Sequence, residues 1–306
     1  MKNLAHTFSI VAHDPKTGQM GVAVQSHWFA VGSLCPWAEA GVGAIATQSL
    51  VDPGYGALGL NLLRRGRSAP ETLAELLTKD ENRENRQVAM VDAKGQVAVH
   101  SGKNCIAEAG HLNSDGWSVQ ANMMKNPSVW PAMAKSFQGA TGDLAERMMT
   151  ALLTAQQEGG DIRGKQSAAL LVVDNQKTEK PWEHVLFNIR VDDHPEPLAE
   201  LQRLLKTQRA YHLMNEGDEL LGKKDFEGAM LKYQAAEEFA AHIDEIPFWV
   251  AVTLAESGSL DKALPIFKRA FGVNPDWAEL VKRLPRSGFL KDDAVMMAKI
   301  MEMLKI

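Results

Sequence analysis

The chain has 306 residues, 45% of them hydrophobic, and a net charge of −5, which is typical of a globular protein with room for two domains. The slightly acidic balance argues against a nucleic-acid-binding protein, and no apolar run approaches the roughly 18 residues of a membrane helix. The first residues contain no apolar signal-peptide core. We therefore expect a cytoplasmic protein with Cys35 and Cys105 as free thiols, although one disulfide remains an alternative.

The first predicted elements are two strands that form a hairpin over residues 7–26. Apolar and polar residues alternate from Thr7 to His13, and Asp14–Gly18 has strong turn chemistry. The small apolar residues 41–49 predict a strand that is buried on both faces. Helices are predicted over 54–67 and 68–80, the second with Ser68 and Glu71 at the spacing of a capping box.

The next elements repeat this order of paired strands and paired helices. Residues 87–102 predict a second hairpin and 117–123 a short strand, followed by helices over 127–137 and 142–160 and by strands over 167–174 and 184–193. A doubly wound parallel sheet would instead alternate single strands with single helices. We therefore predict an α+β fold, a four-layer αββα sandwich made of two antiparallel sheets, each covered by a helix pair.

The last third of the chain predicts an all-α domain of helical repeats. An acidic, proline-rich stretch at 192–197 marks the change in composition, and we place the domains at 1–204 and 205–306. Small and aromatic residues recur at an offset of 34 residues, which is the tetratricopeptide pattern. The matching pairs are Gly217/Ala251, Phe226/Leu260, Ala229/Ala263, Tyr233/Phe267 and Ala236/Ala270.

Two such repeats need additional cover, since about three are required for stability. We expect the cover to come from the first domain, from a third degenerate repeat after Trp277, or from a second subunit in a homo-oligomer. The repeats could also bind a protein or peptide partner. The apolar residues that we expect to be buried by such a contact are Phe248, Trp249, Trp277 and Phe289.

Thr7 is the first candidate for chemistry. A threonine at a free N-terminus can attack a carbonyl with its hydroxyl while its own α-amine, with a pKa near 8, takes the proton. The sequence contains neither the G-x-S-x-G motif of serine hydrolases nor the H-E-x-x-H motif of zinc proteases, so neither motif points to another hydrolytic mechanism. The alternative is that Thr7 is an ordinary strand residue.

Other polar residues lie where such a site would need them. Ser26 and His27 end the second strand and could orient the nucleophile, and the Asn122 amide could donate to an oxyanion. The predicted substrate-binding residues are Gln48, Ser49, Arg163 and Gln166. Each has a structural alternative, such as a turn, a solvent-exposed strand end or an internal ion pair. We expect no metal or organic cofactor, and we interpret residues 192–194 as part of a structured linker.

Several longer segments resemble the bacterial and archaeal family called domain of unknown function 1028. The resemblance covers roughly residues 7–205 and implies a fold like that of N-terminal-nucleophile hydrolases, while the family name leaves the substrate open. In the family pattern, threonine usually follows the initiator Met directly. The segments that carry the resemblance are 7–12, 21–26, 40–48, 159–173 and 190–205.

This chain departs from that pattern because Met1–His6 precede Thr7. The His6–Thr7 bond must be cut before Thr7 can gain a free amine. The first hypothesis is therefore an amidohydrolase that cleaves a small-molecule amide through an acyl ester on Thr7, with Thr7 at a strand end that opens into a cleft. The second hypothesis is a non-catalytic scaffold that uses the same fold and repeats for oligomerisation or peptide binding.

Overall fold

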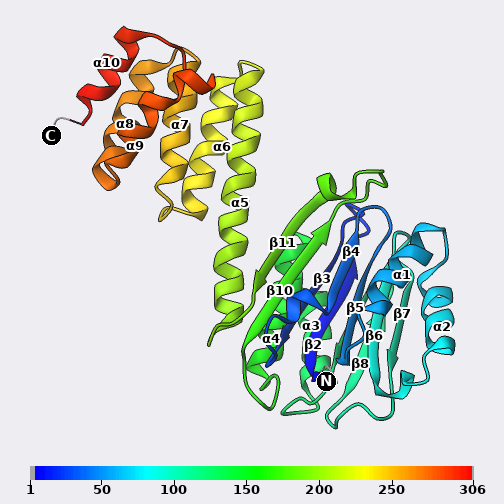
Figure 1. The fold of residues 1–306 in the computed structure, drawn as a ribbon. Helices are drawn as coiled ribbons and strands as arrows, with labels where there is room; N and C mark the ends of the chain where they lie inside the picture. The colour runs from blue at the N-terminus through cyan, green and yellow to red at the C-terminus, as the bar shows by residue number, and fades with distance from the viewer. Residues whose placement is uncertain (1–3, 305–306) are drawn as a thin grey trace. The chain divides into compact units, whose positions relative to one another are not determined.

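The computed structural model describes residues 4–304 and divides into two compact units. Unit 1 is Met1–Leu204 and unit 2 is Leu205–Ile306. Unit 1 contains two antiparallel sheets with helices, and unit 2 is helical (Figure 1). Met1–Asn3, half of the segment that the first hypothesis requires to be removed, lie outside the described residues.

One sheet of unit 1, here called sheet A, has the strand order β1-β5-β6-β7, with β4 also paired to β5. All of its strand pairs are antiparallel. Because β6 pairs with β5 from Gly43 to Ser49 along one edge, β1 and β4 both lie along the other edge, each beside a different part of β5. The strands are β1 (Leu4–Ala5), β4 (Pro36–Glu39), β5 (Gly43–Leu50), β6 (Arg86–Asp92) and β7 (Val97–Ser101).

The other sheet, sheet B, has the order β11-β10-β3-β2-β9-β8. Its central hairpin confirms the first predicted element: Thr7 pairs with Ser26 at the open end, and the Asp14 carboxylate accepts hydrogen bonds from the turn. The strands are β2 (Thr7–His13), β3 (Met20–Ser26), β8 (Gly110–Ser114), β9 (Trp117–Ala121), β10 (Ser167–Val173) and β11 (Val185–Val191).

Each sheet carries a helix pair. Helices α1 (Gly54–Arg64) and α2 (Ala69–Lys79) pack on sheet A, and the predicted capping box of Ser68 and Glu71 is present. Helices α3 (Val129–Gly139) and α4 (Leu144–Gln157) pack on sheet B. The described residues thus confirm a mixed fold with two antiparallel sheets and a C-terminal helical region.

The two faces of sheet A have different partners. Ile45 points into the core beneath α1 and α2, whereas its neighbours Ala44 and Ala46 join Val22 and Val24 of sheet B in the core between the sheets. Successive strand residues point to opposite faces, so the helices and sheet B lie on opposite sides of sheet A. The small side chains of this inner core let the two sheets approach closely.

Unit 2 contains six α-helices within the part of the chain that the structure describes, and the first of them, α5, begins in unit 1. Helices α6 and α8 each have 14 residues and begin 34 residues apart. Phe248 is fully buried and stacks on Trp277 of α9 with 4.5 Å between ring centroids, so unit 2 itself covers this residue, as the alternative of a third helical segment at Trp277 allows. The helices are α5 (Pro197–Gly222), α6 (Phe226–Phe239), α7 (Glu245–Glu256), α8 (Leu260–Val273), α9 (Asp276–Arg283) and α10 (Ala294–Glu302).

Three further features bear on the sequence expectations. Cys35 and Cys105 are both free. Across residues 4–304, no helix has the length and apolar character needed to cross a membrane. The same residues contain no cluster of three or more His, Cys, Asp or Glu side chains suited to a metal ion.

Candidate functional site

Thr7 begins β2 and lies on the strand face that looks toward sheet A. Ser9, on the same face, donates a hydrogen bond to the Gln48 side chain of sheet A at 2.6 Å. Thr7 is fully buried, and it lines none of five cavities of 190–610 Å³ that open on the described surface. The predicted strand end is therefore present, but it is closed rather than open to a cleft.

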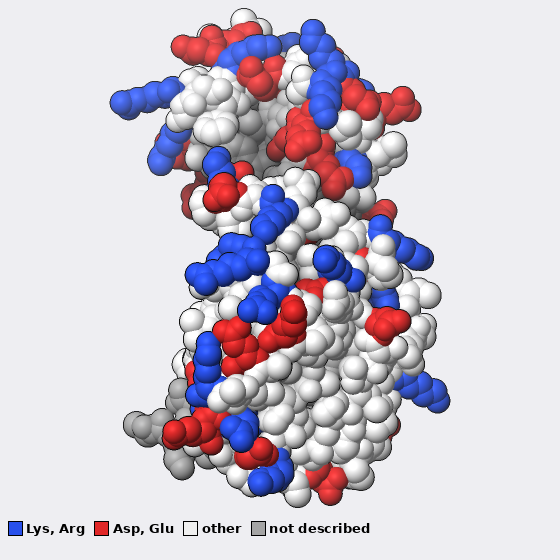
Figure 2. All heavy atoms as spheres, turned by 90° about the vertical axis from the view of Figure 1, so that its right-hand side faces the viewer, with Lys and Arg blue, Asp and Glu red and all other residues white. Residues whose placement is uncertain are grey.

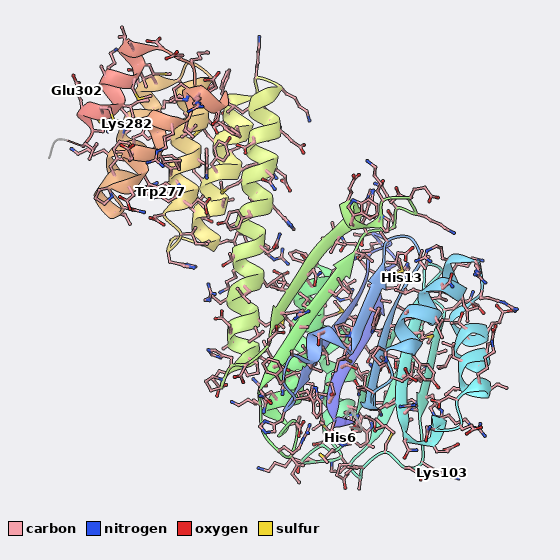
Figure 3. The ribbon with its side chains drawn as sticks, in the orientation of Figure 1. His6, His13, Lys103, Trp277, Lys282 and Glu302 are labelled. Carbon is pink, nitrogen blue, oxygen red and sulfur yellow. The ribbon has the colours of Figure 1, made fainter. Side chains whose placement is uncertain are left out.

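The segment before Thr7 closes this end. Strand β1 pairs with the end of β5, Ala5 opposite Ser49, so the chain crosses from sheet A to sheet B at His6. Figure 3 shows His6 and His13 at opposite ends of β2. The His6 side chain is only 2% exposed. The described part of this segment thus covers the Thr7 end of β2.

Only one of the two ring nitrogens of His6 has a hydrogen-bond partner among the described residues. Its Nδ1 lies 2.7 Å from Oδ1 of Asn122, whereas its buried Nε2 has no hydrogen-bond partner among residues 4–304. Burial lowers the pKa of His6 below its ordinary value, and the Arg163 charge lowers it further, against the opposing effects of Asn122 and Asp161. His6 is therefore neutral at pH 7.

The carbonyl oxygen of the His6–Thr7 peptide bond accepts hydrogen bonds from two strong donors. Ser26 Oγ donates to the His6 oxygen at 2.5 Å, and Arg163 Nη2 donates to it at 2.8 Å. The Asp161 carboxylate, whose side chain is fully buried, fixes Arg163 through hydrogen bonds of 3.0 and 2.7 Å. A hydroxyl and a cation on one carbonyl oxygen stabilise the negative charge that nucleophilic attack would develop there.

A buried amide network continues from Thr7 between the sheets. The Thr7 carbonyl accepts hydrogen bonds from the Asn122 backbone N–H at 3.1 Å and from Gln48 Nε2 at 3.2 Å. The Gln87 side-chain oxygen accepts from both Gln48 and Asn122, at 2.7 and 2.9 Å. Because burying polar groups costs free energy unless they are paired, this network fixes the positions of all three amides.

Two residues beside this network adopt unusual backbone conformations. Ser49 has φ of 70° and Met123 has φ of 58°, in the left-handed region that side chains other than glycine rarely occupy. They directly follow Gln48 and Asn122, the amides that hold the Thr7 carbonyl. Backbone strain of this kind costs about 1–3 kcal/mol per residue and concentrates at functional sites.

Five of the predicted residues meet at the His6–Thr7 bond: Thr7, Ser26, Gln48, Asn122 and Arg163. His6, Gln87 and Asp161 belong to the site but were not predicted from sequence. The signal for Gln87 was a polar residue opening an otherwise apolar strand, "QVAMV".

The remaining predicted residues face elsewhere. The His27 backbone N–H donates to Asp161, while its ring Nδ1 lies 3.4 Å from the Lys165 carbonyl. The Gln166 side chain donates to Asp193, away from Thr7. Ser49 pairs with Ala5 through the backbone and so holds the leading segment in place.

Comparison with known proteins places the chain in a family. The model for a family of unknown function, DUF1028, matches residues 7–201, more than half of the chain, beginning at Thr7. The chain belongs to the DUF1028 family. This DUF1028 chain also resembles the crystal structure of protein SPO2555 from Silicibacter pomeroyi, which carries the same family designation, with 28% identity and a TM-score of 0.60.

That similarity covers 66% of this chain and 85% of the Silicibacter pomeroyi chain. The comparison with curated proteins gave no match. The family description names no activity, so any function of this DUF1028 member must be argued from its own residues.

Proposed function

We propose that unit 1 is an N-terminal-nucleophile amidohydrolase that acts through Thr7 once the His6–Thr7 bond has been cut. The observation that carries the proposal concerns the His6 carbonyl, which lies directly before Thr7 in the chain. Its oxygen accepts hydrogen bonds from both Ser26 Oγ and Arg163 Nη2. The two packed sheets with a helix pair on each are what a four-layer αββα sandwich of this hydrolase type would have.

The cut would be a self-cleavage. The Thr7 hydroxyl oxygen bonds to the His6 carbonyl carbon, and the resulting oxyanion is stabilised by Ser26 and Arg163. The C–N bond then breaks, the nitrogen takes the hydroxyl proton, and His6 becomes an ester on Thr7 with a free α-amine. Water hydrolyses this ester, which gives a His6 carboxylate and restores the Thr7 hydroxyl.

The mature site would repeat the same steps on a substrate amide. The α-amine accepts the Thr7 hydroxyl proton as the oxygen attacks the substrate carbonyl, which occupies the place of the His6 carbonyl. The amine product leaves with that proton, and water hydrolyses the acyl ester. The residues named need neither a metal nor an organic cofactor for these steps. We propose a small-molecule amide as the substrate.

A non-catalytic scaffold is the second proposal. The specific observation in its favour is that Thr7 is fully buried behind the intact leading segment. In this case unit 2, with its 34-residue offset between α6 and α8, would be a tetratricopeptide-type module for homo-oligomerisation or for peptide binding. A cytoplasmic location suits both proposals.

The test compares the full-length protein with a shortened chain in which Met directly precedes Thr7. Removal of Met before a small residue exposes the Thr7 amine, so we expect the shortened chain to hydrolyse members of a panel of amides, acylated amino acids and cyclic ureas without maturation. Thr7→Ser should keep much of the activity, and Thr7→Ala should lose it by a factor on the order of a million. Inactivity of both chains, with Thr7→Ala melting like wild type, favours the scaffold.

A further inference from the structure

Unit 2 contains a cavity of about 610 Å³ that the proposed hydrolase chemistry does not use. Its lining comes from the second half of α5, from α7 and from Phe289. Aromatic and acidic side chains share the lining: Tyr211, Asp218, Glu245, Trp249, Glu256 and Phe289. The volume falls within the range of ligand-binding pockets and exceeds what one side chain fills.

The lining has one sign of charge. It includes three carboxylates and, among the described residues, no Lys, Arg or His. Figure 2 shows acidic side chains, in red, bordering a hollow on the helical unit. Lys291 partly compensates Glu256, because its backbone N–H donates to that carboxylate and its ammonium group to the Glu256 carbonyl. Asp218 and Glu245 therefore carry the negative potential of the cavity.

These two carboxylates are held against aromatic rings. Glu245 accepts hydrogen bonds from Tyr211 Oη at 2.9 Å and from Trp249 Nε1 at 3.1 Å. Asp218 accepts from Tyr233 at 2.7 Å, and burial still raises the pKa of Asp218. A cation beside Asp218 would offset this desolvation, and aromatic rings such as Trp249 and Tyr211, which line the same cavity, attract cations.

We propose that this cavity binds an arginine or lysine side chain of a partner peptide. The charge complementarity favours a basic peptide over an acidic one, since a carboxylate here would face Asp218 and Glu245 without a compensating cation in the lining. The apolar side chains of Met214, Leu221 and Val252 line the same cavity and would take the residues beside the basic one. Basic-peptide binding rests on the second proposal, in which unit 2 binds a peptide, and not on the chemistry of Thr7.

The test measures fluorescence anisotropy of a labelled, end-blocked peptide of alternating leucine and arginine with the full chain. A peptide with glutamate in place of arginine is the matched probe. We expect only the arginine peptide to bind, and the double variant Asp218→Asn/Glu245→Gln, which keeps hydrogen-bond acceptors, to raise its Kd at least tenfold. Glu227→Gln/Glu238→Gln, an equal charge change at two exposed positions on α6, should leave Kd unchanged.

Three results of the binding assay, and one of light scattering, would overturn the proposal. The three are no binding of the arginine peptide by a normally folded wild-type chain, equal binding of the glutamate peptide, and an equal loss of affinity in Glu227→Gln/Glu238→Gln and Asp218→Asn/Glu245→Gln. Circular dichroism of each variant shows whether it is folded. If light scattering finds a dimer that Asp218→Asn/Glu245→Gln converts to monomers, the cavity belongs to a second copy of the chain instead.

Discussion

Ser26 and Arg163 reach the His6 carbonyl by different routes. Ser26 lies directly opposite Thr7 in the β2–β3 register, so strand pairing alone brings its hydroxyl to the bond. Arg163 comes from a loop and depends on the buried Asp161 carboxylate for its position. Removing Arg163 would leave that charge unpaired, a change that can cost about 3–5 kcal/mol of stability. Ser26 is therefore the cleaner residue to test.

We expect Ser26→Ala to slow Thr7-dependent cleavage or hydrolysis by about 10²–10³-fold, which is the typical effect of losing one oxyanion donor. The measurement is the rate of conversion to the shortened mass, or the rate on any amide found in the panel. Ser33→Ala is the control, because the Ser33 hydroxyl donates only to the Ala30 carbonyl in the adjacent loop. A wild-type rate in Ser26→Ala would exclude Ser26 as a donor to the transition state.

His6 should make the stability of the uncut chain depend on pH. Its pKa is lowered in the folded state, so below about pH 6.5 the unfolded state binds more protons and stability falls as pH decreases. In a Thr7→Ala background, which retains His6, we expect a larger loss of urea stability between pH 7.5 and 5.5 than in Thr7→Ala/His6→Gln. His13, His111 and His212 also have lowered pKa values and contribute equally to both chains. Parallel pH profiles would contradict the buried neutral His6.

At the scale of elements, α1 lies unusually close to sheet A. A Cβ on Gly56 would lie 2.2 Å from the ring of Trp37 in β4, and one on Gly59 would lie 2.6 Å from Ile45 Cδ1 in β5. Both glycines are on the buried face of α1. Glycine here serves close packing, because a helix interior otherwise favours alanine. The approach holds β5, and with it Gln48, under α1.

We expect Gly56→Ala to destabilise the protein by about 1–3 kcal/mol through overpacking against Trp37. Thermal unfolding should show a Tm lower by several degrees. Gly139→Ala is the matched control, since a Cβ at Gly139 meets nothing within 4 Å. Equal melting of Gly56→Ala and Gly139→Ala would mean that α1 can move away from the sheet without cost.

The same scale shows what local sequence can predict. The Thr7–Ser26 hairpin and the Ser68 capping box follow from patterns a few residues long, and both are present. Strand β1 was not predicted, because two residues carry no periodicity and their partner, Leu50 with Ser49, lies far along the chain. Gln87 was not predicted either, because its partners are also distant in sequence. Its side-chain amide forms hydrogen bonds with Gln48 and Asn122, which are 39 and 35 positions away.

For the whole molecule, the boundary between the units falls inside α5, after the proline-rich segment that the composition pointed to. The composition change marks where strands end, whereas the helix that follows starts in unit 1 and continues into unit 2. Helices α6 and α8 begin 34 residues apart, at the offset that separates the matching residues in the sequence. The offset gave no information on the acidic lining of the cavity, because Asp218 and Glu245 come from different helices and meet only in the folded unit.

Self-cleavage would break one covalent bond, between His6 and Thr7, and the intact mass of the purified protein tests it most directly. After prolonged incubation at neutral pH, we expect the wild-type chain to lose Met1–His6 and the Thr7→Ala chain to keep them, since cleavage needs the Thr7 hydroxyl. Thr7→Ser should also be cut. A wild-type mass that retains Met1–His6, with an intact His6–Thr7 bond, would contradict self-cleavage and leave Thr7 as a buried strand residue.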